Sequence, residues 1–177
     1  MRKVFMMYII GRSGSGKTTI ANALETELRN AGMQRLQIID GDIIRRQFGD
    51  IFGYSYEERM KCNQVVRVVV QYLIDNGISV VLAQVGGHKE MRHKMKEQFG
   101  DDYIEVYVQC SYEECAKRDV KGYYKKQIEG KINNLNGADD TFDIPTDSDI
   151  VIDSEKEVVS EAVQKIITYL KGHEYGI

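Results

Sequence analysis

The start of the chain combines a buried strand, a glycine-rich loop and a helix, and this order restricts the fold more than any other feature. Residues 4–10 read VFMMYII, a continuous apolar run typical of a strand buried on both faces. Residues 11–18 read GRSGSGKT, which matches the pattern G-x-x-x-x-G-K-[ST] at each fixed position. Ile20, Leu24 and Leu28 follow at helical spacing. A strand that passes through such a loop into a helix predicts an α/β protein with a phosphate-binding loop.

The chemistry of this loop indicates a nucleoside triphosphate. A glycine-rich loop turns backbone N–H groups toward a polyphosphate, and its lysine adds a positive charge for the terminal phosphates. The hydroxyl of Thr18 can ligate a magnesium ion together with waters. A flexible surface turn is the alternative, but it would not need a strand before it and a helix after it. We therefore predict an ATP site formed by Gly11, Ser13, Gly14, Ser15, Gly16, Lys17, Thr18 and Thr19.

Length and charge exclude several classes of protein. With 177 residues the chain is long enough for one well-buried domain and too short for two of ordinary size. A net charge of −3 and a pI near 5.7 provide no basic surface for a nucleic-acid polymer or an anionic membrane. No apolar run approaches the roughly 20 residues of a membrane span, and no secretory signal is recognisable. We expect one cytoplasmic domain over residues 1–177.

Strands and helices alternate along the rest of the chain. Further buried strands are predicted at residues 36–39, 78–85, 103–109 and 150–152, and helices near residues 55–76, 88–99, 111–117 and 158–170. In the helix at 55–76 we expect a buried face of Val65, Val66, Val69, Tyr72 and Leu73. Such alternation requires a parallel sheet covered on both faces. The predicted fold is a P-loop NTPase-type α/β domain with a five-stranded parallel sheet.

The stretch from Asp119 to Asp143 interrupts this alternation. It contains four lysines, two tyrosines and three glycines, but few periodic apolar residues. A structureless insertion of this length in a compact domain is usually functional or disordered. A solvated charged loop is the alternative, whereas the mixture of charge and aromatic rings favours a lid that closes over the nucleotide and excludes water. We expect a lysine-rich lid at about residues 119–137.

Two acidic residues follow the second predicted strand, in the sequence Asp40-Gly41-Asp42. Ligands of open parallel sheets bind beyond the carboxyl ends of the strands, so this turn and the glycine-rich loop should share one crevice. One aspartate could accept a proton from an attacking hydroxyl while the other organises magnesium-bound water. Capping of the next helix is the alternative role, and it suits Asp42 better than Asp40. Arg45 and Arg59 would lie beside the crevice and could bind an oxyanion.

Several motifs together resemble the adenylylsulfate kinase family. They are residues 11–19, Asp40-Gly41-Asp42-x-x-Arg45, residues 54–59 and, as the most specific, Lys121-Gly122-x-Tyr124-Lys125-Lys126. The resemblance extends from about residue 7 to residue 152 with preserved spacing. It implies a P-loop kinase, usually dimeric, that uses magnesium and transfers the γ-phosphoryl group of ATP to the ribose 3′-hydroxyl of adenylyl sulfate.

The resemblance also implies roles for individual residues. Lys17 and Thr18 would hold phosphate and magnesium, and Arg118 would join the ATP site. Asp40 would be the catalytic base, assisted by Asp42. The implied acceptor site comprises Asp40, Arg45, Tyr54, Arg59, Cys62, Asn63, Gln84, Val85, Gly86, Lys121 and Leu135.

The sequence departs from the family pattern on the acceptor side. Cys62 stands where the family has asparagine, and Asn63 is displaced by one residue, which turns a helical side chain by about 100°. Residues 84–87, Gln-Val-Gly-Gly, replace Phe-Ile-Ser-Pro, and Leu135 replaces a lid phenylalanine that would stack on the acceptor base opposite Tyr54. Another small nucleotide, such as cytidine diphosphoramidate, is therefore an alternative acceptor. A nucleotide-gated binding module that hydrolyses ATP slowly is a more distant alternative.

Overall fold

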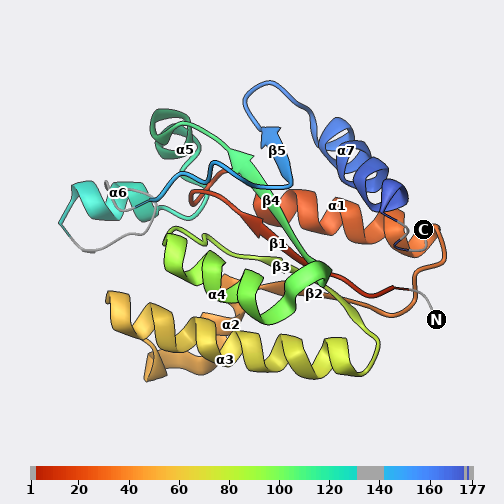
Figure 1. The fold of residues 1–177 in the computed structure, drawn as a ribbon. Helices are drawn as coiled ribbons and strands as arrows, with labels where there is room; N and C mark the ends of the chain where they lie inside the picture. Colours follow the sequence, from red (N-terminus) through yellow and green to blue (C-terminus); the bar gives the residue numbers. More distant parts are fainter. Residues whose placement is uncertain (1–2, 131–141, 174, 176–177) are drawn as a thin grey trace.

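Five parallel strands form the centre of the structure, a computed structural model that describes residues 3–130, 142–173 and 175 (Figure 1). The strands are β1 (Met6–Ile10), β2 (Leu36–Asp40), β3 (Ser79–Ala83), β4 (Tyr103–Gln109) and β5 (Ile150–Asp153). They lie in the order β2-β3-β1-β4-β5, and each neighbouring pair is parallel. This confirms the predicted five-stranded parallel sheet.

Helices cover both faces of the sheet, as Figure 1 shows. They are α1 (Lys17–Asn30), α2 (Gly41–Phe48), α3 (Tyr56–Asp75), α4 (Lys89–Phe99), α5 (Tyr112–Arg118), α6 (Tyr123–Ile128) and α7 (Val159–Gly172), with 3-10 turns at Gly49–Ile51 and Gly100–Asp102. Strand β1 explains why: Met7 and Ile9 pack with α1 and α7, while Met6, Tyr8 and Ile10 pack with α3 and α4. Alternate side chains of a strand point to opposite faces, so a strand covered twice is apolar throughout.

Helix α3 is present as predicted, but its buried face is different. Its first turn is fixed by a capping box in which Ser55 and Glu58 bond each other's backbone N–H groups. Val66 is buried, whereas Val69 and Tyr72 are 43% and 70% exposed. The inward face instead follows the positions of Arg59, Cys62, Asn63, Val66 and Val70. The helix therefore turns polar side chains toward the sheet edge, which apolar periodicity alone does not predict.

The described part of the expected lid, residues 119–130, is more regular than the sequence predicts. Helix α6 forms within it, beginning at Tyr123 after Gly122, and Tyr124 is buried. The apolar residues of this segment are few, but one of them docks on the glycine-rich loop. Residues 131–137 of the predicted lid lie outside the described part of the chain.

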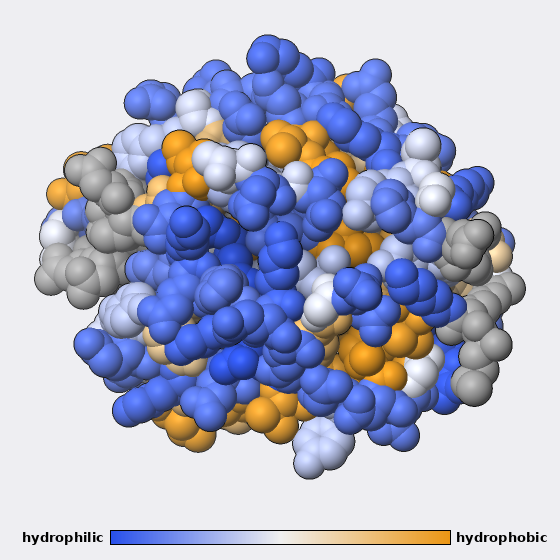
Figure 2. All heavy atoms as spheres, in the orientation of Figure 1, coloured by the Kyte–Doolittle hydropathy of each residue, from blue (hydrophilic) through white to orange (hydrophobic). Residues whose placement is uncertain are grey.

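The carboxyl ends of the strands, with α5 and α6, lie at one end of the molecule, and both chain termini lie at the other (Figure 1). The face seen in Figure 2 is mainly hydrophilic, with separate small hydrophobic areas. None of the described helices has the length and apolar character needed to cross a membrane.

Candidate active site at the carboxyl end of the sheet

The glycine-rich loop makes backbone contacts that exclude side chains. Gly11 has φ 151°, and a Cβ placed there would lie 2.5 Å from the carbonyl oxygen of Val108. Gly14 has φ 82° and packs against the backbone of Cys115, 3.3 Å from a Cβ. The loop is thus pressed against β4 and α5, in a path that only glycine follows without strain. This is the backbone geometry expected of a phosphate cradle at a helix N-terminus.

Lys17 lies in this loop as a buried, poorly compensated cation. Its Nζ donates to the carbonyl oxygen of Arg12 at 2.7 Å. Burial and then the charge of Lys121 lower the pKa of Lys17 to about 8, against smaller opposite effects of Asp42 and Asp40. The buried hydroxyl of Ser15 has no hydrogen-bond partner in the described residues. A bound polyphosphate would satisfy both groups.

Asp40 connects the glycine-rich loop to α2. Its Oδ2 accepts from the hydroxyl of Thr18 at 2.8 Å, and its Oδ1 accepts from the backbone N–H groups of Asp42 and Ile43 at 2.8 and 3.2 Å. Asp40 is therefore the N-cap of α2, and the expectation that Asp42 is the better capping residue is wrong. The cause is that the helix begins at Gly41, directly after Asp40, so that Asp42 lies inside its first turn.

The Thr18 and Asp40 pair has the donor chemistry that suits magnesium. Magnesium takes few protein ligands and completes its shell with waters and substrate phosphates. A hydroxyl and a carboxylate 2.8 Å apart beside the phosphate loop fit that role. Among the described residues no cluster of three or more His, Cys, Asp or Glu side chains could hold a metal by itself. A magnesium ion here would depend on the nucleotide for its remaining ligands.

Two neighbouring cavities lie next to α2, the helix that follows Asp40. The wide cavity has a volume of about 590 Å³ and is lined by α2, the turn after it and the lid, including Arg46, Asp50, Phe52 and Lys121. The narrow cavity has about 60 Å³ and reaches inward to Arg59, Gln84, Val85 and Gly86. Both are lined by Asp42, Arg45, Tyr54 and Tyr123. The wide cavity is within the size range of small-molecule sites.

Two arginines are held in place at the junction of the cavities. Arg45 donates to the carbonyl oxygen of Gly53 at 2.8 Å, and Arg59 donates through Nε to that of Tyr54 at 2.8 Å. Their guanidinium carbons lie 5.3 and 5.4 Å from the ring centroid of Tyr54. Cation–π contact with the ring adds to these bonds. The site therefore presents two ordered positive groups to an incoming anion.

The lid contacts both halves of the site. Lys121 forms an ion pair with Asp42, which lines both cavities. The hydroxyl of Tyr124 donates to the carbonyl oxygen of Ser13 in the glycine-rich loop at 2.8 Å, and this bond is buried. Tyr123, next to it, lines both cavities. One short helix thus joins the ATP loop to the predicted acceptor site.

Not every predicted site residue reaches a cavity. Cys62 and Asn63 are fully buried and line neither of these two cavities, so a contact of either residue with the acceptor stays a prediction. Burial raises the pKa of the Cys62 thiol, although the charges of Arg45 and Arg59 oppose this. The amide of Asn63 has no hydrogen-bond partner in the described residues. Leu135 lies outside the described residues.

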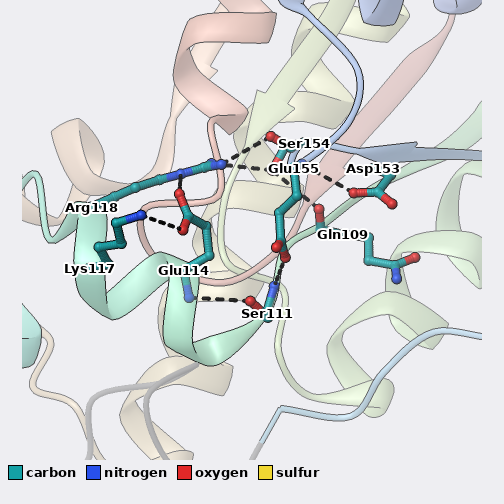
Figure 3. A network of polar contacts seen from close by, with 8 residues as sticks. All are labelled: Gln109, Ser111, Glu114, Lys117, Arg118, Asp153, Ser154 and Glu155. Carbon is teal, nitrogen blue, oxygen red and sulfur yellow. Dashed lines mark hydrogen bonds and ion pairs between the residues drawn. The ribbon is translucent and has the colours of Figure 1, made fainter.

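Arg118 is engaged by protein groups at the edge of the ATP loop (Figure 3). Its Nε donates to Glu114 at 2.9 Å, and its terminal nitrogens donate to the hydroxyl and the carbonyl oxygen of Ser154 at 3.3 and 3.0 Å. Glu155 accepts from the backbone N–H of Ser111 at 2.7 Å. These bonds fasten α5 to the turn after β5. An ATP contact of Arg118 stays a prediction.

Sequence reasoning missed the residues that hold the inner wall of the narrow cavity. Tyr8, buried in β1, donates its hydroxyl to Gln84 Oε1 at 3.0 Å. Arg92 of α4 is buried and donates to the carbonyl oxygen of Gly86 at 2.8 Å. A Cβ on Gly86 would lie 2.5 Å from Ile10, so the loop packs directly on β1. A tyrosine inside an apolar strand and an arginine inside an apolar helix face were the available signals.

The sequence is similar to known proteins over most of its length. The model of the protein family described as adenylylsulphate kinase matches residues 3–153. The adenylyl-sulfate kinase of Staphylococcus epidermidis is 38% identical over 174 residues, which is 98% of this chain and 87% of that protein. That of Thermodesulfovibrio yellowstonii is 37% identical over 96% of this chain and 84% of its own length.

Solved structures show the same fold. The Mycobacterium tuberculosis APS kinase CysC, in complex with AMPPNP and APS, superposes with a TM-score of 0.88 at 26% identity, covering 97% of this chain and 99% of that one. The protein APE1195 gives a TM-score of 0.86 at 30% identity, covering 97% of both chains. The similarity therefore extends over the whole sheet and the helices around it.

Proposed function

We propose, since this chain belongs to the adenylylsulphate kinase family, that it transfers the γ-phosphoryl group of ATP to the ribose 3′-hydroxyl of adenylyl sulfate, giving ADP and 3′-phosphoadenylyl sulfate. The observation that best supports this activity is a pair of hydrogen bonds at Asp40, which accepts from the hydroxyl of Thr18 and from the backbone N–H of Asp42. They join the phosphate loop to a residue that lines the nucleoside-sized cavity.

On the ATP side, the loop of residues 11–18 would hold the phosphates through its backbone N–H groups and through the cation of Lys17. Thr18 and Asp40 would hold magnesium, which when bound neutralises charge on the phosphates. Closure of the lid by α6 would exclude water through the contact of Tyr124 with Ser13. These groups position the phosphoryl group and balance its charge, which is the main requirement of phosphoryl transfer.

On the acceptor side, we propose that Asp42, and not Asp40, takes the proton of the 3′-hydroxyl. Asp40 already accepts three hydrogen bonds and lines neither cavity. Asp42 lines both cavities and is paired with Lys121. The hydroxyl oxygen would attack the γ-phosphorus as its proton passes to Asp42, and the bond to the ADP oxygen would break.

The proposed function is tested by offering the protein magnesium-ATP with adenylyl sulfate, cytidine diphosphoramidate and plain nucleotides in separate reactions. We expect a product with a new 3′-phosphate from adenylyl sulfate, identified by mass spectrometry. Efficient turnover of cytidine diphosphoramidate alone would assign a different acceptor. ADP formation without any phosphorylated product would instead indicate a nucleotide-gated binding module. Lys17→Ala, which removes the loop cation, is the matched inactive control.

A further inference from the structure

The narrow cavity has the size and the charge of a site for a small anion. Its volume of about 60 Å³ is about a tenth of the ~590 Å³ of the wide cavity. The narrow cavity therefore suits a small group such as a tetrahedral oxyanion. Arg45 and Arg59 contribute positive charge to its wall, while the carboxylate of Asp42 is paired with Lys121. The adjoining wide cavity has the volume for the nucleoside.

Gln84 lies in the wall of this narrow cavity with its side chain fixed on two sides. The hydroxyl of Tyr8 donates to its Oε1 at 3.0 Å. Gly41 lies against its stem, since a Cβ there would come within 2.7 Å of Gln84 Cγ. Burial raises the pKa of Tyr8, so its hydroxyl keeps the proton that it donates. With Oε1 engaged by Tyr8, the N–H groups of the Gln84 amide are left for a ligand in the cavity.

We propose that Gln84, oriented by Tyr8, donates hydrogen bonds to the terminal anionic group of the acceptor in the narrow cavity, beside Arg45 and Arg59. This inference rests on the proposed function, because the terminal anion of adenylyl sulfate is its sulfate. Gln84 is then an acceptor-binding residue that recognises the anion and not the base. Tyr8 is a positioning residue, because it reaches the ligand only through Gln84.

The arrangement distinguishes an anion from a neutral donor group. An amide N–H and two guanidinium groups can only donate, so a ligand group with lone pairs on several oxygens satisfies all of them. A ligand without that terminal group would leave the narrow cavity unfilled and would gain nothing from Gln84. Replacement of Gln84 should therefore weaken only those ligands that carry the terminal anion.

The test measures binding with non-reactive ligands, by calorimetry in the presence of ADP and magnesium. The ligands are 3′-deoxyadenylyl sulfate and 3′-deoxyadenosine 5′-phosphate, which lacks the sulfate. In Gln84→Leu we expect the dissociation constant of the sulfate ligand to rise about 10-fold or more, as for loss of a hydrogen bond to a charged group, and that of the phosphate ligand to change less than about 3-fold. Tyr8→Phe should give the same selectivity with a smaller effect.

The matched control is Gln98→Leu, the same chemical change at an exposed position of α4, which should alter neither constant. Equal weakening of both ligands by Gln84→Leu would mean that Gln84 contacts the nucleoside 5′-phosphate that the two ligands share and not the sulfate, and it would overturn the inference alone. Unchanged binding of both ligands would also overturn it. If the wild-type protein binds no sulfate ligand, the proposed function fails together with the inference.

Discussion

At the scale of single residues, Lys17 is a buried cation whose charge a bound phosphate would neutralise. The folded protein buries this side chain and opposes it with a carbonyl oxygen, not with a carboxylate in contact. Its pKa of about 8 lies below the ordinary value of 10.5, so the unfolded chain holds the proton more tightly. The stability cost of Lys17 is therefore full below about pH 8 and is relieved as the pH rises from 8 toward 10.5.

ATP binding should reverse this shift. Phosphate oxygens favour the charged lysine, so nucleotide binding should raise the pKa of Lys17. The protein should then take up about half a proton per bound nucleotide at pH 8. Affinity should fall as the pH rises above 8. Calorimetry of a non-hydrolysable ATP analogue in buffers of different ionisation enthalpy measures the uptake. Lys17→Arg keeps the charge at all these pH values, and persistence of the same uptake in that variant would refute the assignment.

The two aspartates should separate in their kinetic roles. Asp40→Asn keeps a good capping side chain, so we expect the free energy of unfolding to change by less than about 1 kcal/mol. The magnesium concentration needed for half-maximal kcat should rise in this variant. Asp42→Asn removes the proposed proton acceptor and should lower kcat by about 10² to 10⁴-fold without moving the magnesium dependence. Magnesium titrations of kcat distinguish them. The reverse pattern would indicate that Asp40, and not Asp42, is the proton acceptor.

At the scale of elements, α6 determines how the lid meets the rest of the protein. The helix has six residues, so its position depends on tertiary contacts more than on its own propensity. Tyr124 provides the buried contact with Ser13, and its ring packs edge-on against Tyr112 of α5 at 5.5 Å. The lid is therefore fastened to the ATP loop even though its surface lysines face solvent.

Loss of the Tyr124 hydroxyl should loosen the lid. Tyr124→Phe leaves the buried carbonyl oxygen of Ser13 without its partner, a cost of about 1 kcal/mol or more for the closed position. We expect a several-fold higher KM for ATP and faster ATP hydrolysis without acceptor, because water enters more readily. Tyr72→Phe, at a 70% exposed position of α3, is the control. An unchanged rate of acceptor-free hydrolysis would exclude this role.

At the scale of the whole molecule, a buried polar network ties the acceptor site to β4 and to the segment before β5. Arg92 bonds Gly86, and its Nε lies 3.9 Å from Glu105 of β4, with both side chains less than 10% exposed. Glu105 also accepts from the hydroxyls of Tyr103 and Ser148 at 2.6 and 2.7 Å. Helix α4, strand β4 and the segment before β5 are thereby joined behind the narrow cavity.

Breaking this network should destabilise the entire domain. Arg92→Met leaves the carboxylate of Glu105 buried without its cation, which we expect to cost about 3 kcal/mol and to lower Tm by about 10 °C. Thermal unfolding followed by circular dichroism measures the loss. Lys96→Met, which breaks an exposed pair with Asp147, should change Tm by no more than about 2 °C. Equal, small effects in both variants would show that the buried pair is not needed.

The sequence predicted the elements better than the environment of individual side chains. The run at residues 4–10 specified a doubly covered strand, because a strand buried on both faces must be apolar throughout. The face of α3 was not predictable, since Asn63 points inward and Tyr72 outward only after the helix docks. The contact of Tyr8 with Gln84 joins residues 76 positions apart, one on β1 and the other directly after the neighbouring strand β3. The oligomeric state stays a prediction, to be measured by light scattering.

Lys3 and Tyr175, close to the two ends of the described chain, lie together at the end of the sheet opposite the glycine-rich loop (Figure 1). Lys3 Nζ lies 4.5 Å from the ring centroid of Tyr175, and Phe5 packs edge-on against the same ring at 5.5 Å. In a circular permutant, a short linker could therefore join Lys3 to Tyr175 without crossing the active site. New ends at the exposed turn of Gly100–Asp102 would leave the strand order and both cavities unchanged.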